Sequence, residues 1–243
     1  MPETLFIADL HLSPEHPSLQ DLFIRFLQQR ACQAESLYIL GDLFETWLGD
    51  DDDVESLQPL MDTLLLLTQR GLHLTVMRGN RDFLLTPAMV QRLGGQLYTT
   101  DHVIADIYGR PTLLLHGDTL CTEDIAYQTF RRQVRSPEWQ TQFLSLPLTQ
   151  RRDMARQARH LSQHYTQQQD TLITDVTLSA VCELMQQRHV NSLIHGHTHR
   201  PAIHEFMLGE TKAYRYVVGN WHDDAAVFLS CRPEQWTLET WLA

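Results

Sequence analysis

The chain has 243 residues, of which 43% are hydrophobic, and this suits a single α/β domain with a substantial core. Its formal net charge of -11 argues against nucleic-acid binding through a basic face, because such a surface repels polyanions. The four scattered cysteines include no CxxC pair, which argues against a disulfide framework or a zinc knuckle and suits a reducing cytosol.

Short apolar segments alternate with amphipathic stretches through the first half of the chain. The apolar segments cover residues 4–8, 37–40, 72–77 and 112–115, and the first amphipathic stretch covers residues 18–30. Alternation of this kind is typical of strands separated by helices. It predicts an α/β fold with a buried sheet and flanking helices.

After residue 120 the chain becomes rich in arginine and glutamine, and this largely helical region ends near Asp175. We expect Pro137 and Pro147 to divide it into several helices, since proline breaks a helix interior. Strand character returns at residues 192–194, 214–218 and 226–230. We therefore predict one domain over residues 1–243, with a helical insertion, or lid, at about 121–175.

Five short polar motifs follow predicted strands, and the carboxyl ends of strands are where α/β sheets bind ligands. They are Asp9-Leu10-His11, Gly41-Asp42, Gly79-Asn80-Arg81-Asp82, His116-Gly117-Asp118 and Gly196-His197-Thr198-His199. Singly each motif is weak, because an Asp after a strand is more often a helix cap and a lone His is usually a surface or core residue. Three histidines within residues 195–199 are stronger evidence, because a cation is the usual reason for such crowding.

Carboxylate, amide and imidazole groups without thiolates suit Mn²⁺, Fe²⁺, Co²⁺ or Zn²⁺, and two such ions about 3.5–4 Å apart are a standard arrangement for displacement at phosphorus. One carboxylate must bridge such a pair, and Asp42, central in the order of motifs, is the candidate. The aspartate run at residues 50–53 lacks the alternating ligands and the glycine of a calcium loop, so we expect a solvated loop there.

With these motifs in this order, the sequence resembles the calcineurin-like metallophosphoesterase family, whose pattern is D-x-H, GD, GN-[HR]-[DE], a later His and GH-x-H. The resemblance implies two packed β-sheets flanked by helices and a centre of two Mn²⁺ ions bridged by Asp42. The ligands that it implies are Asp9, His11, Asp42 and His199 for one ion, and Asp42, Asn80, His116 and His197 for the other. It also implies that Asn80, Arg81 and His197 are catalytic, whereas His195 should have a structural role and should not be a ligand.

The segments FIADLHL, YILGDLFETWLGDD, GNRDFLL, LLHGDTLCTED and LIHGHTHRP resemble, within that family, the members that hydrolyse UDP-2,3-diacylglucosamine in lipid A biosynthesis. The resemblance implies that a metal-bridged hydroxide attacks the uridine-side phosphorus and releases UMP and 2,3-diacylglucosamine 1-phosphate. The implied substrate contacts are Asn80, Arg81, Asp124, Ser162 and His197. Two further substrate positions of the family, usually Asn and Lys, are Thr166 and Gln169 here.

The same resemblance implies that the lid binds lipid and that the enzyme is peripheral to the cytoplasmic face of the bacterial inner membrane. The first residues lack the pattern of a signal peptide, and no apolar run is long enough to span a bilayer, so we expect any membrane contact to be peripheral. No feature of the sequence indicates an obligate protein partner.

Arg81 favours an anhydride as the substrate. Many family members have a His after the motif's Asn, which can protonate an alkoxide leaving group, whereas arginine keeps its proton near neutral pH. A phosphate leaving group needs little protonation, because its second pKa is about 6. Arg81 is suited to clamp phosphoryl oxygens and stabilise transition-state charge. The alternative is a salt bridge from Arg81 to Asp82 or to another acid.

The predicted lid reverses the charge of the whole chain. Between residues 125 and 165 its arginines are Arg131, Arg132, Arg135, Arg151, Arg152, Arg156 and Arg159, against only Glu138 and Asp153, and the interleaved apolar residues are Phe130, Trp139, Phe143, Leu144, Leu146 and Leu148. This mixture suits an amphipathic surface that meets anionic headgroups and acyl chains. The alternative is that the apolar residues pack the helices on the core and that the arginines form a solvated face.

Two other functions compete with lipid hydrolysis. One is a metallophosphoesterase that acts on soluble nucleotides or on phosphoproteins. The other is a scaffold that kept the fold and lost its chemistry, and the filled ligand positions argue against it.

Overall fold

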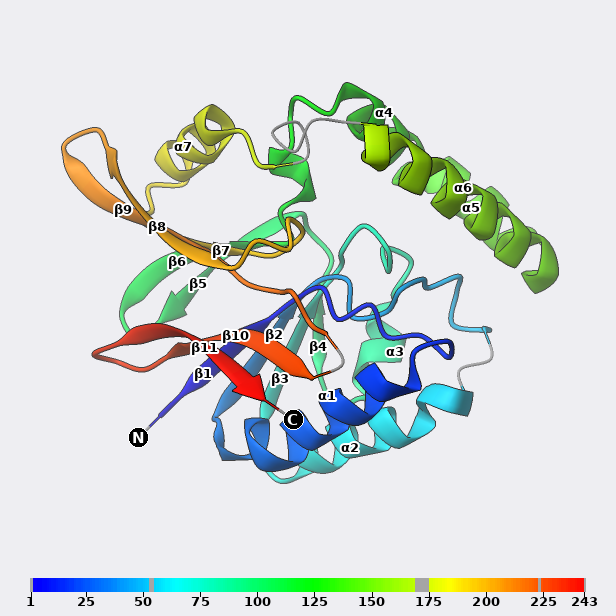
Figure 1. Ribbon diagram of the computed structural model, residues 1–243, viewed down its shortest axis with the longest axis horizontal. Coiled ribbons are helices and arrows are strands. Elements are labelled where there is room, and N and C mark those ends of the chain that lie inside the picture. The colour runs from blue at the N-terminus through cyan, green and yellow to red at the C-terminus, as the bar shows by residue number, and fades with distance from the viewer. Residues whose placement is uncertain (1, 53–54, 169–174, 223, 243) are drawn as a thin grey trace.

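Two β-sheets pack face to face at the centre of the molecule, with helices on their outer faces (Figure 1). The computed structural model describes residues 2–52, 55–168, 175–222 and 224–242, and for residues 161–168 it describes the backbone alone. The six-stranded sheet has the order β11-β10-β1-β2-β3-β4, and the five-stranded sheet has the order β5-β6-β7-β9-β8. The predicted fold of two packed sheets flanked by helices is therefore confirmed.

The six-stranded sheet consists of β1 (Thr4–Ile7), β2 (Ser36–Leu40), β3 (His73–Met77), β4 (Gln96–Tyr98), β10 (Ala225–Cys231) and β11 (Trp236–Leu242). The five-stranded sheet consists of β5 (His102–Ile107), β6 (Arg110–Leu115), β7 (Ser192–His195), β8 (Ala202–Leu208) and β9 (Thr211–Val217). Strands β1 to β4 run parallel, as do β6, β7 and β9. Parallel strands end at the same edge of a sheet, so the loops that follow them lie together.

The helices are α1 (Pro17–Gln29), α2 (Gln58–Gln69), α3 (Pro87–Arg92), α4 (Ile125–Val134), α5 (Pro137–Ser145), α6 (Leu148–Gln168) and α7 (Leu178–Gln187). Short 3₁₀ turns are η1 (Ala31–Gln33), η2 (Glu55–Leu57) and η3 (Asp118–Leu120). Helices α1, α2 and α3 cover the outer face of the six-stranded sheet, and α7 covers the five-stranded sheet (Figure 1).

The central strands are buried on both faces, which explains their continuous apolar sequence. In β1, Leu5 and Ile7 belong to the core beneath the helices, whereas Phe6 and the following Ala8 belong to the core between the sheets. Successive side chains of a strand point to opposite faces, so a strand between two apolar layers needs apolar residues at every position.

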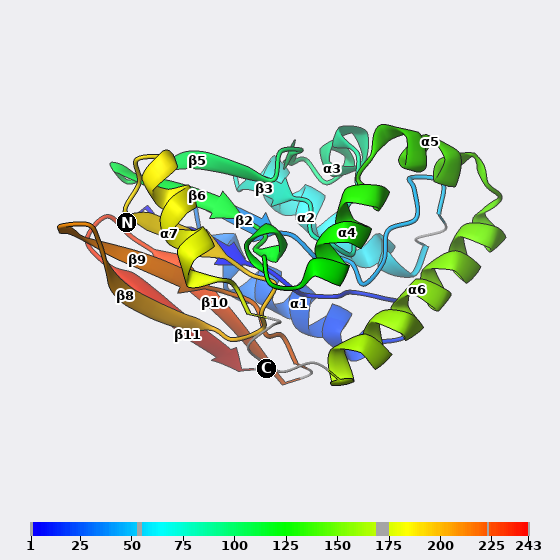
Figure 2. The ribbon, with the colours of Figure 1, turned by 90° about the horizontal axis from the view of Figure 1, so that it is seen from above.

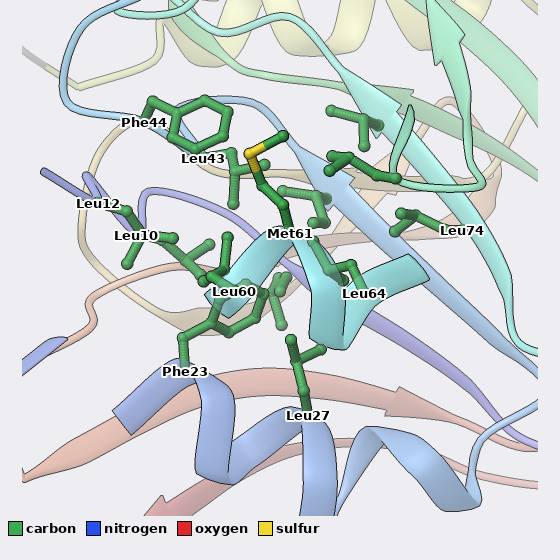
Figure 3. Close-up of a cluster of buried hydrophobic side chains, with 14 of the residues drawn as sticks. Leu10, Leu12, Phe23, Leu27, Leu43, Phe44, Leu60, Met61, Leu64 and Leu74 are labelled. Atoms are coloured by element: carbon green, nitrogen blue, oxygen red, sulfur yellow. The ribbon is translucent and has the colours of Figure 1, made fainter. Parts of the chain in front are cut away.

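Helix α1 is fixed to the sheet by one apolar face. Its buried apolar residues are Leu19, Leu22, Phe23, Phe26 and Leu27, at the spacing of a helix face. Phe23 and Leu27 point toward Leu60 and Leu64 of α2 in the same cluster (Figure 3). Truncating a buried Phe to Ala costs about 3–5 kcal/mol, so this face contributes strongly to stability. Leu10 and Leu12, in the loop after β1, belong to the same apolar cluster, so the packing of α1 also supports that loop.

Helices α4, α5 and α6, which we call the lid helices, lie over the loops at the carboxyl ends of the strands (Figures 1 and 2). Pro137 is the first residue of α5 and Pro147 directly precedes α6, so both prolines separate helices as predicted. Ser136 caps α5 by accepting a hydrogen bond from the N–H of Trp139 at 3.3 Å. Within the described ranges, no helix combines the length and apolar character needed to cross a bilayer.

The aspartate run beside the site ties α6 to the core. The guanidinium of Arg151 is buried, pairs with Asp51, and donates to the carbonyl oxygen of Leu48 at 2.5 Å. Arg152 pairs with Asp52 at 2.6 Å. The run is exposed at Asp51, as expected of a solvated loop, but the carboxylates of Asp51 and Asp52 have arginine partners that the sequence did not predict. Because Asp51 is 64% exposed, solvent screens the ion pair, and the buried hydrogen bond to Leu48 is what makes Arg151 a main attachment of the lid.

Candidate metal centre

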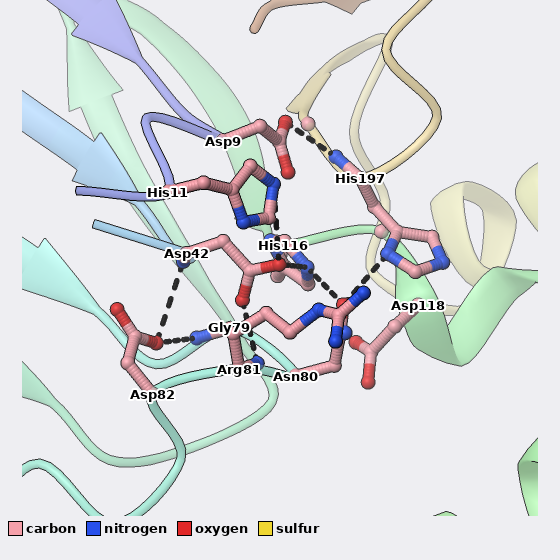
Figure 4. Close-up of polar contacts among 12 residues, drawn as sticks. Asp9, His11, Asp42, Gly79, Asn80, Arg81, Asp82, His116, Asp118 and His197 are labelled. Atoms are coloured by element: carbon pink, nitrogen blue, oxygen red, sulfur yellow. Dashed lines mark hydrogen bonds and ion pairs between the residues drawn. The ribbon is translucent and has the colours of Figure 1, made fainter. Parts of the chain in front are cut away.

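The loops that follow β1, β2, β3, β6 and β7 converge at one edge of the two sheets and carry the predicted ligands (Figure 4). Backbone hydrogen bonds join these loops to one another. The N–H of Asp9 donates to Gly41 at 3.1 Å, that of His11 to Asp42 at 3.0 Å, and that of Gly196 to the carbonyl of His116 at 2.7 Å. The positions of the ligands are thus fixed by the backbone as well as by their side chains.

Five predicted ligands have a left-handed backbone. Their φ values are 57° for Asp9, 52° for His11, 52° for Asp42, 69° for His197 and 53° for His199. Few residues other than glycine adopt this conformation, and Asn, Asp and His adopt it most readily. Backbone strain of this kind concentrates at functional sites. The strain therefore marks the same loops that the motifs mark.

The first group of ligand atoms contains Asp9, His11 and His199, which each offer one atom within 4.8 Å of the others. The Nε2 atoms of His11 and His199 are 3.2 Å apart. Nε2 of His199 lies 3.9 Å from Oδ1 of Asp9, and Nε2 of His11 lies 3.9 Å from Oδ2 of Asp42. The four ligands predicted for one ion are therefore brought together.

The second group surrounds Asn80. Its Oδ1 lies 2.8 Å from Nε2 of His116 and 2.8 Å from Nδ1 of His197. Nε2 of His116 lies 3.6 Å from the same Asp42 Oδ2 that faces His11. The Asp42 carboxylate thus lies between the two groups, which supports its proposed bridging position. Asp9 is also near both groups, since atoms of Asp9, Asp42 and His116 lie within 4.8 Å of one another.

The electrostatics of these residues fit a cation. Asp9 is buried, and its Oδ1 has no hydrogen-bond partner among the described residues. Burial and the neighbouring charge of Asp42 raise the pKa of Asp9, and burial raises the pKa of Asp42, so a cation would relieve both. Burial lowers the pKa of His116, and it lowers the pKa of His197 to about 4 and that of His199 to about 3. These imidazoles are therefore neutral near pH 7, which is the form that binds metals.

Asp82 joins two of the ligand loops. This fully buried carboxylate accepts through Oδ1 from the N–H groups of Gly79 at 2.7 Å and Asp42 at 3.3 Å. It accepts through Oδ2 from those of Leu43 at 2.8 Å and Phe44 at 3.4 Å. Its bonds to the loops after β2 and β3 hold the loop of Asp42 against the loop that carries Asn80 (Figure 4).

Arg81 faces the metal centre and not Asp82. The backbone N–H of Arg81 donates to Oδ1 of Asp42 at 2.7 Å. Its guanidinium lies close enough to His197 to contribute to the lowered pKa of that imidazole. The nearest acid to its side chain is Glu45, whose Oε1 lies 3.8 Å from Nη1 of Arg81. Among the described residues Arg81 forms no ion pair with Asp82, whose oxygens accept from backbone N–H groups, but its pair with Glu45 matches the other form of that alternative, a salt bridge to another acid.

The remaining predicted substrate contacts lie on the lid. Asp124 is buried and caps α4, accepting from the N–H of Tyr127 at 2.9 Å. Ser162 and Thr166 are in the part of α6 for which only the backbone is described, and Gln169 lies outside the described residues. Their contacts with substrate stay predictions.

Sequence reasoning missed how Asp118 is used. Its motif was singled out with the ligand-bearing ones, but its carboxylate accepts from the Tyr127 hydroxyl at 2.6 Å and from Nε of Arg131 at 2.7 Å. Burial raises the pKa of Asp118, yet the charge of His116 in its protonated form and the charge of Arg131 outweigh burial and lower that pKa well below its usual range. Asp118 is therefore an ionised anchor for α4 beside the centre. The one sequence signal for this role was that Asp118, the third residue of the HGD motif, had no ligand assignment.

Most lid arginines are paired. The ion pairs are Arg131 with Asp101 and Asp118, Arg151 with Asp51, Arg152 with Asp52, Arg156 with Asp153, and Arg159 with Glu45. Arg135 instead donates to the carbonyl oxygen of Gly79 at 2.8 Å. The predicted cationic patch is thus largely neutralised, mainly by acids of the core.

The apolar residues of the lid divide between packing and exposure. Phe143 is buried, and Trp139 and Leu148 pack against the core, as the alternative interpretation requires. Phe130 and Leu144 are 48% and 42% exposed, as a lipid-facing surface requires. The packing interpretation is therefore confirmed for Trp139, Phe143 and Leu148, and the lipid-facing interpretation stays a prediction for the exposed residues.

The calcineurin-like phosphoesterase family matches residues 3–201, which include both groups of ligand atoms. The chain therefore belongs to the calcineurin-like phosphoesterase family. Membership implies a dinuclear metal centre, and the two groups around Asp42 have the composition and spacing to form one.

Curated relatives match the chain over almost its full length. It is 45% identical to UDP-2,3-diacylglucosamine hydrolase of Stenotrophomonas maltophilia, covering 98% of each chain. It is 47% identical to the protein of the same name from Serratia proteamaculans and 43% identical to that from Escherichia coli, covering in both cases 92% of this chain and 93% of the relative. The narrower resemblance indicated by the sequence segments is thus confirmed.

Proposed function

We propose that this hydrolase cleaves the pyrophosphate bond of UDP-2,3-diacylglucosamine in lipid A biosynthesis, giving UMP and 2,3-diacylglucosamine 1-phosphate. The observation that carries the proposal is the place of Arg81 beside Asn80, in a centre built from two groups of metal-binding side chains around Asp42. The names of the relatives support the same substrate.

We assign two Mn²⁺ ions to the centre, with Asp42 as the bridging ligand. One ion would be held by Asp9, His11, Asp42 and His199, and the other by Asp42, Asn80, His116 and His197. When bound, such a pair neutralises phosphoryl charge and provides a water-derived nucleophile near neutral pH.

Arg81 determines the class of leaving group. Its guanidinium is suited to bind phosphoryl oxygens and to stabilise the charge that develops during in-line displacement, but it does not donate a proton near pH 7. Attack at the uridine-side phosphorus releases 2,3-diacylglucosamine 1-phosphate, a phosphate that departs without general-acid help. Nδ1 of the neutral His197 imidazole lies 2.8 Å from Oδ1 of Asn80, and these two side chains together orient the phosphoryl group.

The lid helices provide the lipid-facing surface in this proposal. Exposed Ile125, Phe130, Leu144 and Met154 lie on α4, α5 and α6, and the exposed guanidinium of Arg132 lies beside them in the sequence of α4. Apolar groups next to cationic ones favour the interface of an anionic bilayer. We therefore place the enzyme peripherally on the cytoplasmic face of the inner membrane. Loss of co-sedimentation with anionic lipid vesicles on Phe130→Ser and Leu144→Ser would support this placement, and unchanged co-sedimentation would contradict it.

The substrate assignment is tested by comparing the acylated UDP-sugar in detergent with soluble nucleotide diesters and monoesters, all with Mn²⁺ present. We expect UMP release from the UDP-sugar, and its loss in Asp42→Ala and His116→Ala. Faster turnover of the soluble compounds would favour a soluble-substrate phosphoesterase instead. A folded chain that binds Mn²⁺ but turns over none of these compounds would favour the scaffold hypothesis.

A further inference from the structure

Glu45 is a buried carboxylate beside the metal centre that none of the assignments above uses. It follows Asp42 by three residues in the loop after β2, and it is 8% exposed. Its N–H donates to the carbonyl oxygen of Leu12 at 3.0 Å, which holds its backbone to the loop that carries His11. The carboxylate therefore has a defined place between two ligand loops.

One oxygen of Glu45 faces a predicted ligand. Oε2 lies 3.0 Å from Nδ1 of His11, while Nε2 of the same ring faces His199 and Asp42. A carboxylate at Nδ1 favours the tautomer with its proton on Nδ1, which leaves the lone pair of Nε2 free for a metal. At this distance Glu45 contacts the ring without an aligned hydrogen bond, and forming that bond would fix both the tautomer and the orientation of His11.

The other oxygen faces two arginines. Oε1 lies 2.8 Å from Nη1 of Arg159 in α6 and 3.8 Å from Nη1 of Arg81. The side chain of Arg159 is 40% exposed and that of Arg81 is 30% exposed, so both side chains are partly accessible to solvent. One buried carboxylate therefore joins a metal ligand, the predicted catalytic arginine and a lid helix.

We propose that Glu45 is a positioning residue that orients His11 for metal binding and holds Arg81 and Arg159 together at the entrance of the site. The two guanidinium groups then converge where the phosphates of a pyrophosphate substrate enter, and the lid is attached directly to the metal centre. The role at the entrance rests on the proposed function, because it concerns the substrate. The role in orienting His11 does not, because metal binding is measured without turnover.

The chain contains a matched control for this residue. Asp52 also pairs with an arginine of α6, Arg152, at 2.6 Å, and its side chain is 16% exposed. Among the described contacts, Asp52 touches none of the predicted ligands. Asp52→Asn therefore loosens a lid attachment of the same kind without disturbing His11.

The first measurement is calorimetric titration of the metal-free protein with Mn²⁺. We expect Glu45→Ala to weaken Mn²⁺ binding about 10–100-fold, the usual effect of removing the partner of a metal-binding histidine. Glu45→Gln retains the volume and one acceptor oxygen, so we expect a smaller loss in a variant whose folding is least disturbed. Asp52→Asn should bind Mn²⁺ as the wild type does. Wild-type affinity in both Glu45 variants would overturn the orienting role.

The second measurement is steady-state hydrolysis of the acylated UDP-sugar at saturating Mn²⁺. Arg159→Ala should raise KM more than it lowers kcat and leave Mn²⁺ affinity unchanged. Combined with Glu45→Gln, it should raise KM less than the product of the two single effects, because both variants break the same contact. Independent effects on KM would overturn the entrance role. If the wild type binds Mn²⁺ but does not hydrolyse the UDP-sugar, the proposed function fails while the titration still tests Glu45.

Discussion

Replacing Asp82 by Asn should damage both the stability and the metal centre of this enzyme. Each carboxylate oxygen accepts one short and one longer hydrogen bond from the backbone, at 2.7 and 3.3 Å for Oδ1 and at 2.8 and 3.4 Å for Oδ2. Whichever way the amide is turned, its NH₂ group meets two N–H donors and loses both bonds. One such bond to a charged acceptor contributes about 1.5–3 kcal/mol, and a buried donor left without a partner costs about 1–3 kcal/mol. We expect a total loss of about 3 kcal/mol or more.

Thermal unfolding and metal titration check this prediction together. For a chain of this length the expected loss lowers Tm by roughly 6–12 °C. Because Asp82 holds the loops of Asp42 and Asn80 together, Mn²⁺ affinity and kcat should fall as well. Asp62→Asn is the control, since Asp62 is exposed on α2 and accepts one bond from Gln58 at 2.7 Å. An Asp82→Asn variant with the Tm and Mn²⁺ affinity of the wild type would refute the reasoning.

Three further predictions concern metal, pH and the lid. Removing divalent ions with EDTA should abolish turnover and lower Tm, and Mn²⁺ should restore both, since a ligand of the native state stabilises it; an unchanged Tm would contradict this. Burial raises the pKa of Glu3, but hydrogen bonds and charges from arginines such as Arg30 lower it overall, to about 2. Ionised Glu3 therefore stabilises the native state by at most about 3 kcal/mol, and by less after screening. This stabilisation should be complete above about pH 4.5 and should decline as the pH falls toward 2. Denaturant unfolding should therefore show the difference between wild type and Glu3→Gln shrinking below pH 4.5, and a constant difference would count against it. Arg151→Met should release α6, seen as faster amide exchange at residues 148–160, whereas unchanged exchange would show that the buried guanidinium is not an attachment.

The positions of the candidate ligands followed from the sequence because they depend on local order. Each ligand motif comes directly after an apolar strand, and parallel strands bring such positions to one edge, so the order of motifs was enough to place Asp9, Asp42 and Asn80 together. Glu45 had no such signal. It lies within an apolar segment, and its importance comes from Arg159, which is distant in the sequence and reaches it only when α6 folds over the core.

The lid was predicted less completely for the same reason. Its helical character and its dividing prolines are local properties, and they agree with the described helices α4, α5 and α6. The partners of its arginines are acids in the loops of the core, such as Asp51 and Asp101, so a count of charges within the lid alone overestimated its positive surface. Ion pairs between distant segments are set by the packing of the helices, which composition does not contain.

The left-handed backbone at the ligand positions changes what their residue types mean. A position held at φ near +55° accepts Gly, Asn, Asp or His and rejects most other residues, whether or not a metal binds there. A descendant that lost its chemistry would thus be restricted to Gly, Asn, Asp or His at positions 9, 11, 42, 197 and 199, so an Asp or His there is weaker evidence of a metal site than it would be elsewhere. Asn80 and His116 have no such backbone constraint, so of the predicted ligands they are the two whose presence reports most directly on catalysis.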